Sequence, residues 1–176
     1  MGSINIKVEY PHPPRKVWFA LTDSDAIAAW LMENNFKPEV GHEFTLRTDP
    51  APGFDGVVHC KVIELVEEKR LSFSWRGGPL DTIATFELRP TAVGTELTFT
   101  QTGFSGFKSN LTRLILRSGS KKIYHRLLPA LLDRIDADGA LRGESSPEAC
   151  DMRGFWRVLV GLFAPLLGKR PEERND

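Results

Sequence analysis

The stretch VVHCKVIELVEEKRLSFSWRGGPLDTIATFELRPTAVGTELTFT, residues 57–100, decides the fold. Apolar residues alternate with polar ones within it, and polar or glycine-containing turns at 67–69, 77–79 and 93–94 divide it into segments. A period of two is typical of strands with one apolar and one polar face. Because the connections are short, consecutive segments favour an antiparallel meander. The sequence therefore predicts a sheet whose apolar face needs a cover.

The flanking sequence extends this sheet. Residues 4–10 alternate as a first strand, and a further strand is expected around Phe44 and Leu46. Between them, 14–21 and 24–31 carry the apolar spacing of two short helices.

A long amphipathic helix over about 118–137 provides the cover. Pro129 lies inside it and is expected to kink it, because proline removes one backbone hydrogen bond. A shorter helix over 108–117 precedes it, with Leu111, Leu114 and Ile115 as its apolar stripe and Gly119 at the join. The residues at helical spacing in the long helix are Tyr124, Leu127, Leu128, Leu131, Leu132 and Ile135.

Length and composition restrict the function. The chain has 176 residues, enough for about one domain, and 23 basic residues balance 23 acidic ones. A net charge of zero argues against a nucleic-acid partner. The longest nearly apolar run, 155–167, is shorter than the roughly 20 residues of a bilayer span, and the N-terminus lacks a signal-peptide pattern. We expect a cytoplasmic protein without integral membrane insertion, with Cys60 and Cys150 as free thiols.

The last 38 residues, 139–176, are expected to lie outside the main domain, 1–138, as a linker, an additional amphipathic helix and a disordered tail. The 147–168 helix carries too many apolar residues to stay exposed. Three alternatives follow: docking on its own domain, homodimerisation through this helix, or a membrane interface.

Several short strings, in this order and spacing, resemble one known family. They are PRKVW at 14–18, ALTD at 20–23, GVV at 56–58, RLSFSW at 70–75, GF at 103–104 and KKI at 121–123. The chain resembles, over about 5–137, the START-like (SRPBCC) superfamily, and within it bacterial proteins similar to the C-terminal domain of the activator of the ninety-kilodalton heat-shock chaperone ATPase. The resemblance implies an α+β helix-grip fold, in which a curved antiparallel sheet wraps a long C-terminal helix and leaves a mostly apolar cavity. The superfamily includes carriers, cyclases, hydrolases and chaperone regulators, so fold alone does not assign the activity.

The expected cavity lining follows from strand phase and helix stripe. Aromatic residues on the apolar face suit a flat apolar ligand. Cys60 shares its face with Val58 and Val62 and is expected inside. The predicted ligand-binding residues are Trp30, Phe44, Cys60, Phe73, Trp75, Phe86 and Leu128.

Motifs for catalysis are weak in this sequence. None of the four histidines has metal-ligand spacing, and we expect no metal and no cofactor. His59, Glu64, Arg76 and Asp81 are candidates for acid/base chemistry, but they form no convergent pair, so no catalytic residue is assigned.

The leading hypothesis is a domain that binds a small apolar or amphipathic molecule without catalysis. The alternatives are a cyclase- or hydrolase-type enzyme using the same cavity, and a chaperone-interacting or regulatory protein.

Overall fold

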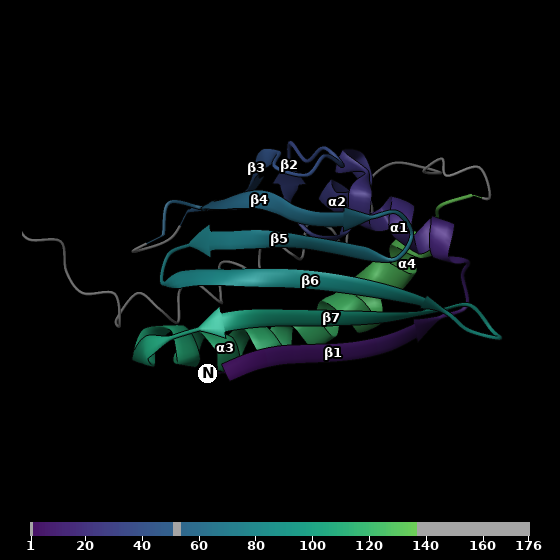
Figure 1. The fold of residues 1–176 in the computed structure, drawn as a ribbon. Coiled ribbons are helices and arrows are strands. Elements are labelled where there is room, and N and C mark those ends of the chain that lie inside the picture. Colours follow the sequence, from purple (N-terminus) through teal and green to yellow (C-terminus); the bar gives the residue numbers. More distant parts are fainter. Residues whose placement is uncertain (1, 51–53, 137–176) are drawn as a thin grey trace, which may run out of the picture.

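The computed structural model describes residues 2–50 and 54–136 (Figure 1). A seven-stranded antiparallel sheet in the order β1-β7-β6-β5-β4-β3-β2 packs one face against the helices. The strands are β1 (Gly2–Tyr10), β2 (Glu33–Asn34), β3 (Glu43–Arg47), β4 (Val57–Val66), β5 (Arg70–Gly77), β6 (Leu80–Pro90) and β7 (Thr95–Phe104). The helical elements are α1 (Pro14–Thr22), α2 (Ser24–Trp30), α3 (Gly106–Lys122), η1 (Ile123–Leu127) and α4 (Leu128–Leu132). The predicted α+β helix-grip fold is confirmed.

The alternation of residues 57–100 explains the two faces of the sheet. Leu71 lies opposite Phe86, and Phe86 lies opposite Phe99, so these apolar side chains share the face under the helices, here called the inner face. All three are at most 5% exposed. Ser72 and Thr85 pair on the other, outer face, where their hydroxyls are 2.8 Å apart. The meander predicted from the turns is the observed β3-to-β7 order.

The short helices fix the position of Trp30. Asp23 accepts a hydrogen bond from the Ala26 amide at 2.9 Å and so caps the start of α2. The Trp30 indole N–H donates to the Ala20 carbonyl at 2.8 Å, which fastens α2 to α1. Its ring centroid lies 6.0 Å from that of Tyr124, and this contact ties both helices to the C-terminal helical segment.

The helical segment has its irregular turn just before Pro129 and not at Gly119. α3 runs through Gly119 without interruption, so the predicted join there is wrong. The irregular part is η1, a π-helical turn in which the Leu128 N–H donates to the Ile123 carbonyl, five residues back. Continuing this pattern would pair the Tyr124 carbonyl with Pro129, which has no N–H. The Tyr10 hydroxyl donates to that carbonyl instead, at 2.6 Å.

The predicted apolar stripe of the shorter helix is also wrong. Leu114 is 56% exposed and Leu111 only partly buried. Because η1 and α4 continue α3, their large buried residues, such as Tyr124 and Leu128, set the rotation of the whole segment. That rotation turns the small and polar side of α3 toward the sheet. Among the residues of α3 whose burial is described, the buried ones are Ser109, Thr112, Leu116, Gly119 and Ser120.

The helical segment ends at Leu132 rather than at 137, although Ile135 beyond it is only 2% exposed. The expected linker, additional helix and tail over 139–176, and with them Cys150 and the 147–168 helix, lie outside the described residues. Within the described part of the chain, no helix combines the length and apolar character needed to span a bilayer.

Candidate functional site

Two small hollows lie between the inner face and the helices. The α3 hollow, about 30 Å³, is lined by residues that include Phe73, Trp75, Phe99, Gln101, Ser120 and Tyr124. The α2 hollow, about 20 Å³, is lined by residues that include Leu21, Trp30, Phe36 and Phe44. Leu31, Phe73 and Phe86 line both, so the two spaces adjoin along these side chains. Each hollow has room for about one water molecule, whereas ligand pockets usually exceed about 300 Å³. As they stand, the two hollows are therefore too small to hold a ligand.

Aromatic side chains form a continuous wall along both hollows. Ring centroids are 5.4 Å apart for Phe44 and Phe73, 6.0 Å for Phe73 and Phe86, and 5.0 Å for Phe86 and Phe99. The wall ends at Tyr124, 4.8 Å from Phe99. These separations are typical of favourable aromatic contacts. Such a wall offers flat apolar surface to a ligand that opens the hollows.

The α3 hollow has a polar part. Gln101 lies on the inner face of β7, opposite Ala84, and is 4% exposed. Its Nε2 donates to the Thr82 Oγ1 at 2.9 Å, and the Thr82 hydroxyl donates to the Trp75 carbonyl at 3.3 Å. Ser120 lines the same hollow from α3. An amide and a hydroxyl thus lie within an otherwise aromatic enclosure.

Two buried tyrosines carry neutral phenols. Burial raises the pKa of Tyr124 well above its ordinary value, and Tyr10 adds to this effect. Burial likewise raises the pKa of Tyr10. Because the ionised phenolate is disfavoured in both cases, each hydroxyl stays protonated and can donate a hydrogen bond. Neither can act as a general base near neutral pH.

Five of the seven predicted ligand-binding residues line the hollows. Phe73, Trp75 and Phe86 line the α3 hollow, while Trp30 and Phe44 line the α2 hollow together with Phe73 and Phe86. The structure thus brings these aromatics together around adjoining spaces.

Cys60 and Leu128 lie elsewhere in the core. They are 4% and 0% exposed, and neither is among the described lining residues of the two hollows. Burial raises the pKa of the Cys60 thiol to about 12, so that it stays protonated and unreactive at neutral pH.

The four acid/base candidates do not point into the hollows. Glu64 is in phase with the inner residues of β4 by sequence, but a bulge after Val62 shifts the register and pairs Glu64 with Ser72 of the outer face. There Glu64 forms an ion pair with Arg70 at 2.8 Å.

The other three candidates form a row across the outer face. His59 lies opposite Arg76, and Arg76 lies opposite Asp81. The Arg76 and Asp81 side chains are 66% and 74% exposed and pair at 3.1 Å. The structure thus brings these residues together, but on an open surface where solvent screens their charges. The described residues contain no group of three or more His, Cys, Asp or Glu side chains arranged to hold a metal.

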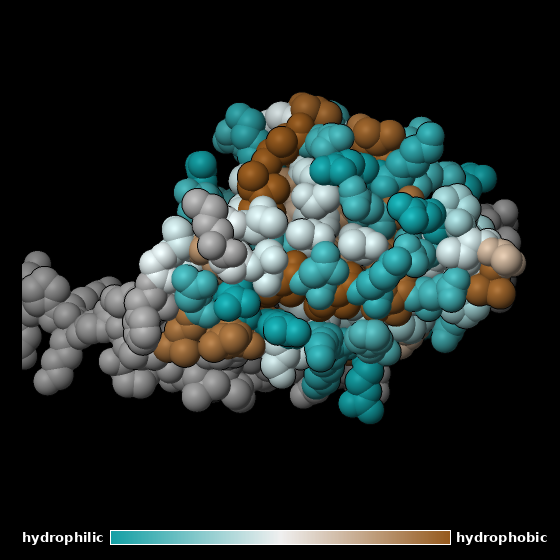
Figure 2. Space-filling view, turned by 60° about the horizontal axis from the view of Figure 1, so that its bottom comes forward, coloured by the Kyte–Doolittle hydropathy of each residue, from teal (hydrophilic) through white to brown (hydrophobic). Residues whose placement is uncertain are grey.

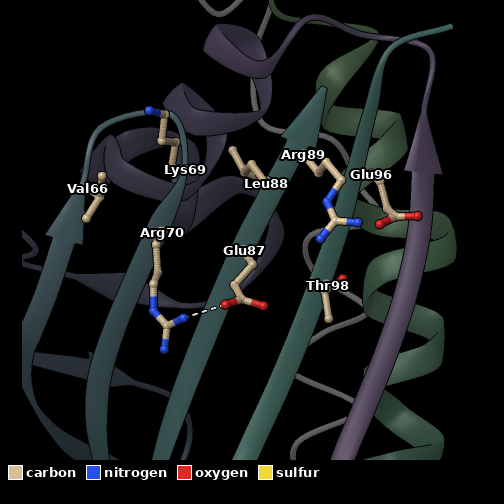
Figure 3. Close-up of a pocket in the computed structure, with 8 residues that line it drawn as sticks. All are labelled: Val66, Lys69, Arg70, Glu87, Leu88, Arg89, Glu96 and Thr98. Carbon is tan, nitrogen blue, oxygen red and sulfur yellow. Dashed lines mark hydrogen bonds and ion pairs between the residues drawn. The ribbon is translucent and has the colours of Figure 1, made fainter. Parts of the chain in front are cut away.

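The outer face carries a larger but charged groove of about 330 Å³ (Figure 3). Lys69, Arg70, Glu87, Arg89 and Glu96 are among its lining residues, and Arg70 forms an ion pair with Glu87. Hydrophilic and apolar residues are intermixed on the face of the molecule that Figure 2 shows. The groove therefore suits a polar contact and not an apolar ligand.

Sequence reasoning missed Gln101, Ser120 and Tyr124 as site residues. The strand expected around 97–99 continues to Phe104, and Gln101 falls in phase with Leu97 and Phe99. A polar residue at an apolar position of a strand is the signal that could have identified it. For Ser120 no local signal exists, because the rotation of α3 depends on η1 and α4.

Comparisons with known proteins agree with this fold. The family model described as "Activator of Hsp90 ATPase homolog 1-like protein" matches residues 11–132. The structure of MLL2253 from Mesorhizobium loti is 34% identical, with a TM-score of 0.70 over 77% of this chain and 99% of that one. The solution structure of BH1534 from Bacillus halodurans is 27% identical, with a TM-score of 0.61 over 73% of this chain and 95% of that one.

DynU16, a protein in the dynemicin biosynthetic locus, shares the fold at 23% identity, with a TM-score of 0.62 over 74% of this chain and 47% of that one. A search of curated proteins gave no significant match. The family match covers more than half of the chain, and MLL2253 is matched over 77% of it at 34% identity. This chain therefore belongs to the activator of Hsp90 ATPase homolog 1-like family.

Proposed function

We propose that this domain binds a small apolar or amphipathic molecule between the inner face of the sheet and α3, without catalysing a reaction on it. The observation that carries the proposal is the α3 hollow, an aromatic enclosure with an amide and hydroxyls in its wall. Its described lining residues offer neutral groups, with no carboxylate, imidazole or ammonium. Such a site holds an apolar molecule but provides no general base.

Displacement of α3 would open the site. Of the α3 residues whose burial is described, Ser109, Thr112 and Ser120 are small and polar, and Leu116 is the large apolar side chain that is buried. By contrast, η1 and α4 bury large side chains such as Tyr124 and Leu131, and the Tyr10 hydroxyl holds the turn between them. Among the described residues, α3 thus buries less apolar area than η1 and α4 together, and lifting it costs less hydrophobic free energy. The contacts of a ligand with the aromatic wall would offset the hydrophobic free energy that is lost when α3 lifts.

Native mass spectrometry of the freshly purified full chain, followed by extraction and small-molecule mass analysis, tests the proposal. A co-purifying apolar compound at near-stoichiometric level is expected. Ser120→Leu fills the α3 hollow and should reduce loading, whereas Ser118→Leu, on the exposed side of the same helix, should not. The proposal is overturned if the protein neither carries an apolar compound nor binds added apolar probes. Equal loading of the two variants would also overturn it.

The cyclase or hydrolase alternative would require proton transfer inside this site. The Tyr124 phenol, whose pKa is raised by burial, could donate a hydrogen bond to a substrate carbonyl but could not accept a proton from it. Product formation by the full chain and its loss in Tyr124→Phe would favour that alternative over simple binding.

A second candidate function rests on the outer groove, which is about ten times larger than the α3 hollow. No ion pair among the described residues engages Lys69 or Arg89, whereas Glu87 and Glu96 pair with Arg70 and Lys7. This surface suits an acidic segment of a partner protein. Binding of a hexaglutamate peptide that weakens with salt and in Lys69→Gln/Arg89→Gln would support it, and salt-independent or absent binding would contradict it.

A further inference from the structure

We propose that the ligand is a flat, uncharged ring compound whose hydroxyl group donates a hydrogen bond to the side-chain carbonyl of Gln101. This inference rests on the proposed function and specifies the class of ligand.

The hydrogen bonds around Thr82 fix the orientation of the Gln101 amide. A threonine hydroxyl has one proton, and Thr82 donates it to the Trp75 carbonyl. Thr82 must therefore accept from Gln101, which places the amide nitrogen, Nε2, toward Thr82 at 2.9 Å. The carbonyl oxygen, Oε1, is the other end of the same amide and has no hydrogen-bond partner among the described residues.

Gln101 is only 4% exposed, but its Oε1 is not among the fully buried side-chain atoms without a partner, so this oxygen stays accessible to a hydrogen-bond donor. Gln101 lines the α3 hollow, so a ligand there can supply the missing donor. A hydroxyl is the best match, because it can donate to Oε1 and also accept from the second N–H of Nε2. A ketone or ether could only accept and would leave Oε1 unpaired.

The rest of the enclosure defines the body of the ligand. Phe73, Trp75 and Phe99 present ring surfaces, which favour a flat apolar skeleton. No cation is among the described lining residues, and both Tyr124 and Ser120 are neutral, so a carboxylate or sulfonate would be buried without a counter-ion. The site therefore selects against anionic analogues of the same size.

Three probes of similar size test the inference on the full chain by equilibrium dialysis: 2-naphthol, 2-methylnaphthalene and 2-naphthoate at pH 7.5. We expect 2-naphthol to bind about tenfold more tightly than 2-methylnaphthalene, and 2-naphthoate to bind most weakly. In Gln101→Met, which keeps the side-chain length but removes the amide, the naphthol preference should fall to about one. Thr102→Val changes the exposed neighbour on the same strand and should keep the preference.

The outcomes separate the two proposals. Equal binding of 2-naphthol and 2-methylnaphthalene by the native protein would overturn the hydroxyl inference and leave the binding function standing. No binding of either would contradict both. If Gln101→Met does not fold, the side-chain amide resonances of Gln101 in the native protein provide the second readout. They should shift with 2-naphthol far more than with 2-methylnaphthalene, and equal shifts would contradict the inference.

Discussion

Replacing Tyr10 by phenylalanine should destabilise the protein through the backbone of η1. The Tyr10 hydroxyl donates to the Tyr124 carbonyl at 2.6 Å, and Tyr10 is only 1% exposed. The π-helical pattern leaves this carbonyl without a helical partner, because residue 129 is a proline. Tyr10→Phe therefore leaves a buried carbonyl unpaired, at a cost of about 1–3 kcal/mol.

Urea denaturation, monitored by circular dichroism, measures the free energy of unfolding that Tyr10→Phe loses. For a chain of this size each kcal/mol corresponds to a fall in Tm of about 2–4 °C. The matched control is Tyr124→Phe, which removes a hydroxyl with no hydrogen-bond partner among the described residues and should cost less.

A double-mutant cycle tests whether the unpaired Tyr124 carbonyl is the reason for the loss of stability. Pro129→Ala restores an N–H at the position where the π-helical pattern needs a donor, so Tyr10→Phe should cost about 1 kcal/mol less in that background. Equal costs in both backgrounds, or equal costs of Tyr10→Phe and Tyr124→Phe, would refute the assignment of the carbonyl as the reason.

Three further predictions concern stability. The free energy of unfolding should fall as the pH rises above about 10. Burial raises the pKa of Tyr10 and Tyr124, so the native state keeps protons that the unfolded chain releases at this pH. An unfolding midpoint in urea that stays constant between pH 9 and 11 would contradict this. Gly94→Ala should lower the Tm, at a cost of about 1–3 kcal/mol, because its Cβ would lie 2.8 Å from the backbone nitrogen of His12; an unchanged thermal melt would exclude this crowding. Arg76→Gln should cost less than about 1 kcal/mol by urea titration, because the ion pair that it breaks is exposed; a larger loss would mean that the outer row is structural.

Much of the sheet could be predicted from local patterns. The alternation around Phe73 and Phe86 places these residues on the inner face, and the structure confirms that face. Glu64 shows where this reasoning fails, because the bulge after Val62 changes the phase of β4 without a local sequence signal. The aromatic lining of the hollows was therefore predictable, whereas the position of this carboxylate was not.

The sequence by itself determined the strands, the inner aromatic residues and the family, because strand periodicity and short motifs depend on neighbouring residues. The tertiary structure alone decided the rotation of α3, the polar part of its hollow and the small volume of the hollows. The reason is that these features depend on contacts between distant parts of the chain. The Tyr10 hydroxyl reaches a carbonyl 114 residues away, and Gln101 of β7 meets Thr82 of β6 beneath Ser120 of α3. A pattern within one segment contains no information about which side of another segment it will meet.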